Sequence, residues 1–191
     1  MSKPNTLLQV RDLQIRVGEH GPLAVDGLSF DVAPGEIVAL VGESGSGKTM
    51  AARAAIGLLP MPMQVCGGSL DFQGRDLVTL DAPAMRAIRG AQIGMVFQEP
   101  MVSLNPALTI GRQMAEALTL HTDLDPPQIH ERCVEMLQRI GIRDAERCLK
   151  AYPHQFSGGM RQRIMLASVM LLRPKLLIAD EPTTALDCLA Q

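Results

Sequence analysis

Apolar and polar residues alternate over the first 32 positions, as in β-strands that bury one face. Residues 7–17 (LLQVRDLQIRV) show this two-residue period, and residues 23–32 predict a second strand that ends at a Pro34-Gly35 turn. A continuous apolar run then extends from Ile37 to Val41. Such a run predicts a short strand buried on both faces.

Beyond this point, helical and strand patterns alternate. The predicted elements are a helix from about Gly47 to Leu59, a strand near Ser69–Phe72, a helix near Pro83–Ile88, a strand at Ile93–Phe97, helical structure over Thr109–Ile142, a helix at Gly158–Leu172 and a strand at Leu176–Ala179. This alternation predicts an α/β sheet, with a helical insertion at about residues 99–172 between two of its strands.

Composition narrows the functional classes. The 191 residues are 47% hydrophobic, and 18 Lys and Arg residues oppose 20 Asp and Glu residues, which gives a net charge of -2. We therefore expect a folded chain without the concentrated basic face that nucleic acid requires. No run approaches the length of a membrane-spanning helix, and Met1–Gln14 has no signal-peptide pattern, so a cytosolic location is expected. The four cysteines lack zinc-ligand spacing and are expected to be free and mostly buried.

Residues 42–49 carry the first chemical motif, GESGSGKT, in the pattern G-x-x-x-x-G-K-[ST]. Its members are Gly42, Glu43, Ser44, Gly45, Ser46, Gly47, Lys48 and Thr49. Glycines allow backbone N–H groups to converge on an anion, and the N-terminus of the following helix favours phosphate. Lys48 can reach β- and γ-phosphate oxygens, and the Thr49 hydroxyl can bind Mg²⁺. The alternative is a flexible Gly/Ser turn, which the flanking strand and helix disfavour.

The second motif is an acidic pair at the end of the last predicted strand. Asp180 and Glu181 follow the apolar residues Leu176–Ala179. Beside a phosphate loop, Asp180 could hold Mg²⁺ and Glu181 could act as general base toward the attacking water. A solvated acid pair at a strand end is the alternative.

With two further motifs, the chain resembles an ABC-transporter ATPase of the oligopeptide, dipeptide and nickel importer subgroup. The four motifs are GESGSGKT (42–49), VFQEPMVSLNP (96–106), YPHQFSGGMRQR (152–163) and LLIADEPTTALD (176–187). The resemblance implies a P-loop NTPase (RecA-like) mixed sheet, an N-terminal antiparallel β subdomain and an inserted helical subdomain. The chain would be one nucleotide-binding domain, incomplete after Gln191.

The resemblance also assigns roles. Gln98 would sense the γ-phosphate and bind Mg²⁺, and residues 98–106 would face the permease, although they also suit an ordinary proline-bounded loop. Ser157, Gly158, Gly159 and Asp187 would contact ATP bound to a second cassette in a head-to-tail dimer. Ser157 is a favourable N-cap and the two glycines leave its helix start bare, which agrees with a phosphate there.

The implied cofactors are ATP and Mg²⁺. The implied partners are a second ATPase subunit, identical or paralogous, integral-membrane permease subunits and, indirectly, an extracytoplasmic solute-binding protein. The chain would then lie peripherally on the cytoplasmic side of the cell membrane and power the import of peptides or a related small solute.

Two departures from the family pattern leave alternatives open. Residues 17–21 hold no aromatic side chain to stack on adenine, so His20 or Val17 would have to substitute. The chain also stops soon after Asp187, before the family's switch histidine, so we expect marginal stability and little or no ATP turnover by this chain alone. A non-hydrolysing fragment and a non-transport ABC ATPase are the competing interpretations.

Overall fold

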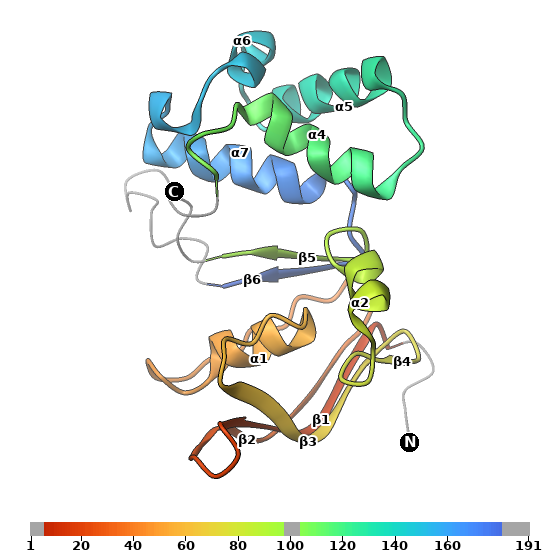
Figure 1. Cartoon of the computed structure of the whole chain (residues 1–191), viewed down its shortest axis with the longest axis vertical. Coiled ribbons are helices and arrows are strands. Elements are labelled where there is room, and N and C mark those ends of the chain that lie inside the picture. The colour runs from red at the N-terminus through yellow and green to blue at the C-terminus, as the bar shows by residue number, and fades with distance from the viewer. Residues whose placement is uncertain (1–5, 98–103, 181–191) are drawn as a thin grey trace. The chain divides into compact units, whose positions relative to one another are not determined.

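The computed structural model describes residues 6–97 and 104–180, and the chain divides into two compact units between Arg86 and Ala87 (Figure 1). The first unit contains an antiparallel sheet, an eight-residue helix and most of a second short helix. The second contains a short parallel sheet and a helical bundle.

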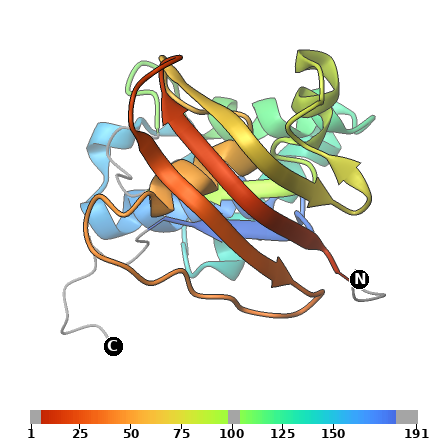
Figure 2. The same cartoon turned by 90° about the horizontal axis from the view of Figure 1, so that it is seen from below.

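The sheet of the first unit has the order β2-β1-β3-β4. Its strands are β1 (Leu8–Val17), β2 (Leu23–Val32), β3 (Met63–Phe72) and β4 (Arg75–Asp76). The central strand β1 pairs with both neighbours, so that Leu8 lies opposite Val32 on one side and Phe72 on the other. Helix α1 (Lys48–Ala55) contacts β1 and β2 and lies across one face of this sheet (Figure 2).

A bulge in β1 keeps the apolar side chains of this strand on its buried face. Val10 and Leu13 are both buried although they are three residues apart, because Arg11 and Asp12 both turn outward between them. Asp12 has a positive φ of 44°, and its N–H donates to the Ser29 hydroxyl at 2.7 Å. The bulge therefore restores the two-residue period after one extra position.

The strand predictions for this unit are confirmed at residues 7–17, 23–32 and 69–72, although β3 begins six residues earlier than expected. The predicted strand at Ile37–Val41 is wrong. These residues have no regular structure, and Ile37 and Val41 are 98% and 93% exposed. Apolar character alone does not make a strand, because the backbone also needs a neighbour for its hydrogen bonds. Within the described part of the chain, no strand pairs with this run.

The second unit is built on a parallel pair, β5 (Ile93–Val96) and β6 (Leu176–Ala179), with Ile93 opposite Leu176. The helices are α4 (Ile110–His121), α5 (Pro126–Arg139), α6 (Ala145–Lys150) and α7 (Gly158–Met170), and α2 (Ala82–Ile88) precedes β5. One apolar core, which includes Ile110, Leu137 and Ile164, joins the four later helices. A break after His121 divides the predicted stretch 109–142 into α4 and α5, and α6 was not predicted.

The described cysteines are free and mostly buried, as expected, since two of the three are buried. Cys133 and Cys148 lie in the helical core, where burial raises the pKa of each thiol to about 11, with Asp144 adding to the effect at Cys148. Cys66 is exposed on β3. In the described ranges, every helix is too short or too polar to cross a bilayer.

The bulge leads to a prediction for Gly68→Ala. Gly68 has a φ of +79°, and an added Cβ would collide with the backbone oxygens of Arg11 and Asp12. Gly74→Ala is the matched control, because its φ is +81° and nothing lies within 4 Å of the added carbon. We expect Gly74→Ala to lower the free energy of unfolding by about 1 kcal/mol, and Gly68→Ala to lower it by about 1–3 kcal/mol more. Urea unfolding of the two variants measures both values. Equal losses for the two variants would show that the bulge does not need this close approach.

Candidate nucleotide site

The predicted phosphate loop connects the exposed run 37–41 to helix α1. Residues 42–46 are exposed, and a turn in which the Ser46 N–H donates to the Glu43 carbonyl at 3.2 Å shapes the middle of the loop. The helix begins at Lys48, and Gly47 precedes it as N-cap with φ 89°. No side chain caps this helix, and its first turn holds no acidic residue. A helix start without a side-chain cap or an acidic residue favours an anion nearby.

Gly47 lies directly against β2, and this contact sets where the helix begins. A Cβ on Gly47 would collide with the Ala24 carbonyl oxygen and would lie 2.8 Å from Val25 Cγ2. Only glycine combines the positive φ with so close an approach. The motif predicted a glycine here for its backbone freedom, but the sequence alone did not point to Ala24 and Val25 as its support.

Lys48 lies back over the loop from which it projects. Its Nζ donates to the carbonyl oxygens of Gly42 and Glu43, both at 2.8 Å, and to the Ser46 hydroxyl at 3.4 Å. The ammonium group is thus held beside the uncapped helix start by neutral oxygens. Phosphate oxygens carry more negative charge than these carbonyls and form stronger hydrogen bonds with an ammonium.

The described acidic residue of the second motif lies in the second unit. Asp180 directly follows β6, and its N–H donates to the Val96 carbonyl at 3.0 Å, which extends the hydrogen-bond ladder between β5 and β6. The side chain of Asp180 is half-buried. The other predicted residues near the metal and the water, Gln98 and Glu181, lie outside the described residues, as does Asp187.

The third motif occupies the start of α7. Ser157 is the N-cap, with φ -64° and ψ 162°, and its hydroxyl accepts from the Met160 N–H at 3.4 Å. Gly158 is exposed and Gly159 is half-buried, and nothing lies within 4 Å of a Cβ added to either. The prediction of a capped helix start with an open backbone surface is confirmed.

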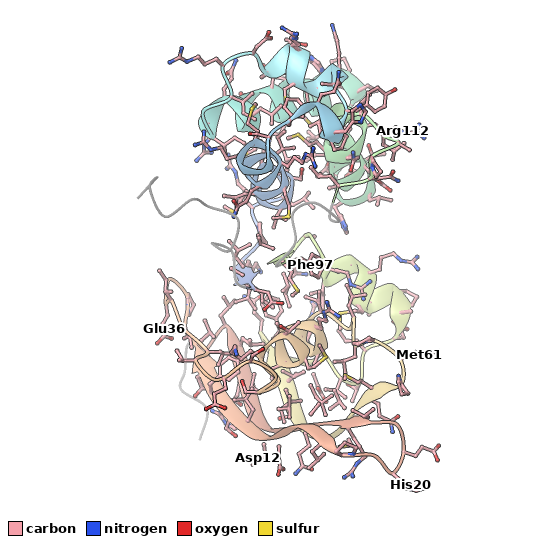
Figure 3. The ribbon with its side chains drawn as sticks, turned by 90° about the vertical axis from the view of Figure 1, so that its left-hand side faces the viewer. Asp12, His20, Glu36, Met61, Phe97 and Arg112 are labelled. Carbon is pink, nitrogen blue, oxygen red and sulfur yellow. The ribbon has the colours of Figure 1, made fainter. Side chains whose placement is uncertain are left out.

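The structure brings residues 42–49 together in one loop and places Ser157–Gly159 and Asp180 on separate elements of the other unit. His20, considered for the adenine, is exposed at the tip of the β1–β2 hairpin (Figure 3). The Gly18 N–H in this hairpin donates to the Pro62 carbonyl at 3.0 Å. Among residues 6–97 and 104–180, no three His, Cys, Asp or Glu side chains gather as a metal cage.

The chain belongs to the ABC transporter family, whose domain matches residues 25–184. It is 52% identical to the peptidoglycan transport ATP-binding protein YejF of Agrobacterium fabrum, over 100% of this chain and 36% of that protein. It is 48% identical to the dipeptide transport ATP-binding protein DppD of Haemophilus influenzae, over 97% of this chain and 57% of the relative. The chain therefore spans about half, or less, of the length of these curated relatives.

Among solved structures, the chain is similar to a dimeric post-hydrolysis state of the ATP-binding cassette MJ0796 bound to ADP and Pi. The TM-score is 0.81 at 26% identity, over 95% of this chain and 76% of that one. The predicted family and the α/β cassette fold are thereby confirmed.

The contact between Gly47 and β2 predicts a difference between two alanine variants of the loop. Gly45 and Gly47 have φ values of +84° and +89°, but only Gly47 has neighbours within 4 Å of an added Cβ. Backbone strain should lower the free energy of unfolding of both variants by about 1 kcal/mol. The collision with β2 should lower that of Gly47→Ala by about 1–3 kcal/mol more. Thermal melts of the two variants measure this difference. If Gly47→Ala were as stable as Gly45→Ala, the contact of Gly47 with β2 would not hold the start of α1 as proposed.

Proposed function

We propose that this chain binds Mg·ATP through residues 42–49 and is the ATP-hydrolysing part of an ABC importer subunit. The observation that carries the proposal is the arrangement of the loop: an uncapped helix start, glycines that leave the backbone open, and a lysine held by neutral oxygens. Each feature serves the recognition of a triphosphate, which carries several negative oxygens in a row.

The residues present fit Mg²⁺. Thr49 and Asp180 offer a hydroxyl and a carboxylate, the oxygen ligands that this ion prefers, and Gln98 adds an amide oxygen. Mg²⁺ commonly takes only one or two protein carboxylates and completes its coordination with phosphate oxygens and water. When bound, Mg²⁺ would neutralise part of the charge on the β- and γ-phosphates.

In the proposed reaction, Lys48 exchanges the carbonyl oxygens of Gly42 and Glu43 for phosphate oxygens. The N–H groups at the start of α1 donate to the same phosphates. Glu181 accepts a proton from the attacking water, and Gln98 orients that water and contacts the γ-phosphate. These groups act mainly by placing positive charge and hydrogen-bond donors around the transferring phosphoryl group.

The same proposal includes a second cassette subunit. Ser157, Gly158, Gly159 and Asp187 of one subunit would contact the ATP held by residues 42–49 of the other. The open backbone of Gly158 and Gly159 supports this, since a phosphate could approach without meeting a side chain.

Transport of peptides or a related small solute is proposed because the relatives are named as peptidoglycan and dipeptide transport ATP-binding proteins. The partners would be integral-membrane permease subunits, with a solute-binding protein acting indirectly, and the chain would lie peripherally on the cytoplasmic side of the membrane. No role in nucleic-acid binding is proposed, given the balanced charge.

A thermal melt with and without Mg·ATP tests the binding step. Mg·ATP at about 100 times its Kd should stabilise the chain by about 2.7 kcal/mol. Lys48→Ala should lose most of this gain because the main cation of the loop is gone, whereas the control Lys150→Ala, at the exposed end of α6, should keep it. Equal stabilisation of the Lys48→Ala and Lys150→Ala chains would refute the proposed phosphate site.

A second candidate function is nucleotide binding without turnover. It is favoured by the exposed run 37–41, which leads directly into the phosphate loop and has no strand partner among the described residues. We expect this chain alone to release little or no phosphate from ATP. Turnover requires the phosphate loop to be held in place, and a strand partner for residues 37–41 would provide that support. Steady-state hydrolysis that Glu181→Gln abolishes would reject this candidate and establish the chain as an ATPase on its own.

A further inference from the structure

We propose that Arg161 is a positioning residue that holds the turn before α7 so that Ser157, Gly158 and Gly159 present their backbone to a phosphate. This inference rests on the proposed two-subunit site. It adds a residue whose side chain need not touch the nucleotide.

The first observation is the pair of backbone oxygens that Arg161 binds. Its Nε donates to the Phe156 carbonyl at 2.9 Å, and its Nη2 donates to the His154 carbonyl at 3.4 Å. Both carbonyls belong to the turn that enters α7, whereas Arg161 itself lies in the first turns of that helix. The guanidinium therefore joins the helix to the segment that leads into it.

The rest of this turn is held by its own contacts. The short 3₁₀ helix η1 spans Pro153–Gln155, and the Tyr152 N–H donates to Gln155 Oε1 at 2.8 Å. The rings of Tyr152 and His154 stack with centroids 5.7 Å apart, and Phe156 packs against the helical core. The turn is therefore held by hydrogen bonds from Arg161 on its polar side and by packing of Phe156 on its apolar side. This turn determines the direction in which the chain reaches Ser157.

The second observation is the charge at this helix start. The first turn of α7 contains no acidic residue, and Arg161 adds a positive charge close to the positive end of the helix dipole. An anion bound near this helix start would be favoured both by the helix dipole and by this charge.

A planar guanidinium suits this task better than an ammonium. Two different nitrogens of Arg161 reach two different carbonyls, and the planar guanidinium holds these donors at a fixed spacing. Arg161→Lys keeps the charge but loses the fork, so it separates positioning from simple attraction of phosphate. Arg163→Ala is the matched control, because it removes the same charge from an exposed position two residues further along α7.

The test measures Mg·ATP-driven dimer formation by light scattering and the radiolabelled ATP retained by the dimer, all in a Glu181→Gln background that preserves ATP. Arg161→Ala and Arg161→Lys should each weaken dimer formation roughly tenfold or more, because hydrogen bonds to a charged group are lost. Both should keep the stabilisation that Mg·ATP gives to their own phosphate loop. Arg163→Ala should dimerise like the reference chain.

Mixtures of variants show on which side of the shared site Arg161 acts. Arg161→Ala mixed with Lys48→Ala should retain about a quarter of the reference ATP, because half of the dimers are mixed and each has one intact site. Arg161→Ala mixed with Gly158→Asp should recover no ATP beyond what Arg161→Ala retains alone, since both changes damage the α7 side. The reference mixture, Lys48→Ala with Gly158→Asp, should recover ATP to the same extent as the first mixture.

Three results would overturn the inference while the reference mixture recovers ATP. They are dimer formation by Arg161→Ala like the reference chain, dimer formation by Arg161→Lys like the reference chain, or recovery of ATP when Arg161→Ala is mixed with Gly158→Asp. If the reference mixture itself fails to recover ATP, the two-subunit site is wrong, and the role of Arg161 is overturned with it.

Discussion

The close contact between Gly47 and β2 is the constraint on which the candidate site depends. It places the start of α1, which no side chain caps, against the carbonyl of Ala24. The same helix buries Ala51, Ala54 and Ala55 as it contacts β1 and β2. The packing of α1 on the sheet and the position of the candidate anion site therefore depend on the same contact. A side chain at position 47 would disturb both.

Lys48 shows how such a site can be stable before a ligand arrives. An ammonium beside a helix N-terminus is electrostatically unfavourable, and the carbonyls of Gly42 and Glu43 offset part of this cost. Neutral oxygens are weaker partners than phosphate, so the exchange of one for the other favours binding. In the second unit, the start of α7 is also stable without a ligand, because the Ser157 hydroxyl accepts a hydrogen bond from the Met160 N–H. Gly158 and Gly159 leave the backbone accessible there.

Much of this could be predicted from the sequence because the signals were local. The alternation in residues 7–17 and 23–32, the glycines and lysine of residues 42–49 and the N-cap Ser157 each express a rule that acts within a few residues. The family resemblance added roles for Gln98, Glu181 and Asp187, which lie outside the described residues and remain predictions.

The failures were long-range. The run Ile37–Val41 has the composition of a buried strand but is exposed, because strand formation depends on a partner that composition does not specify. The contact of Gly47 with Ala24 and the bonds from Arg161 to the turn before α7 depend on chain folding, so no spacing in the sequence predicted them.

The most direct test of the central claim is a titration of the ¹⁵N-labelled chain with Mg·ATP, followed by the amide resonances of each residue. The account predicts that the largest shifts occur at residues 44–49, where N–H groups acquire phosphate partners and Lys48 leaves the carbonyls of Gly42 and Glu43. An unchanged spectrum at these residues, or shifts confined to other parts of the chain, would contradict the assignment of this loop as the nucleotide site.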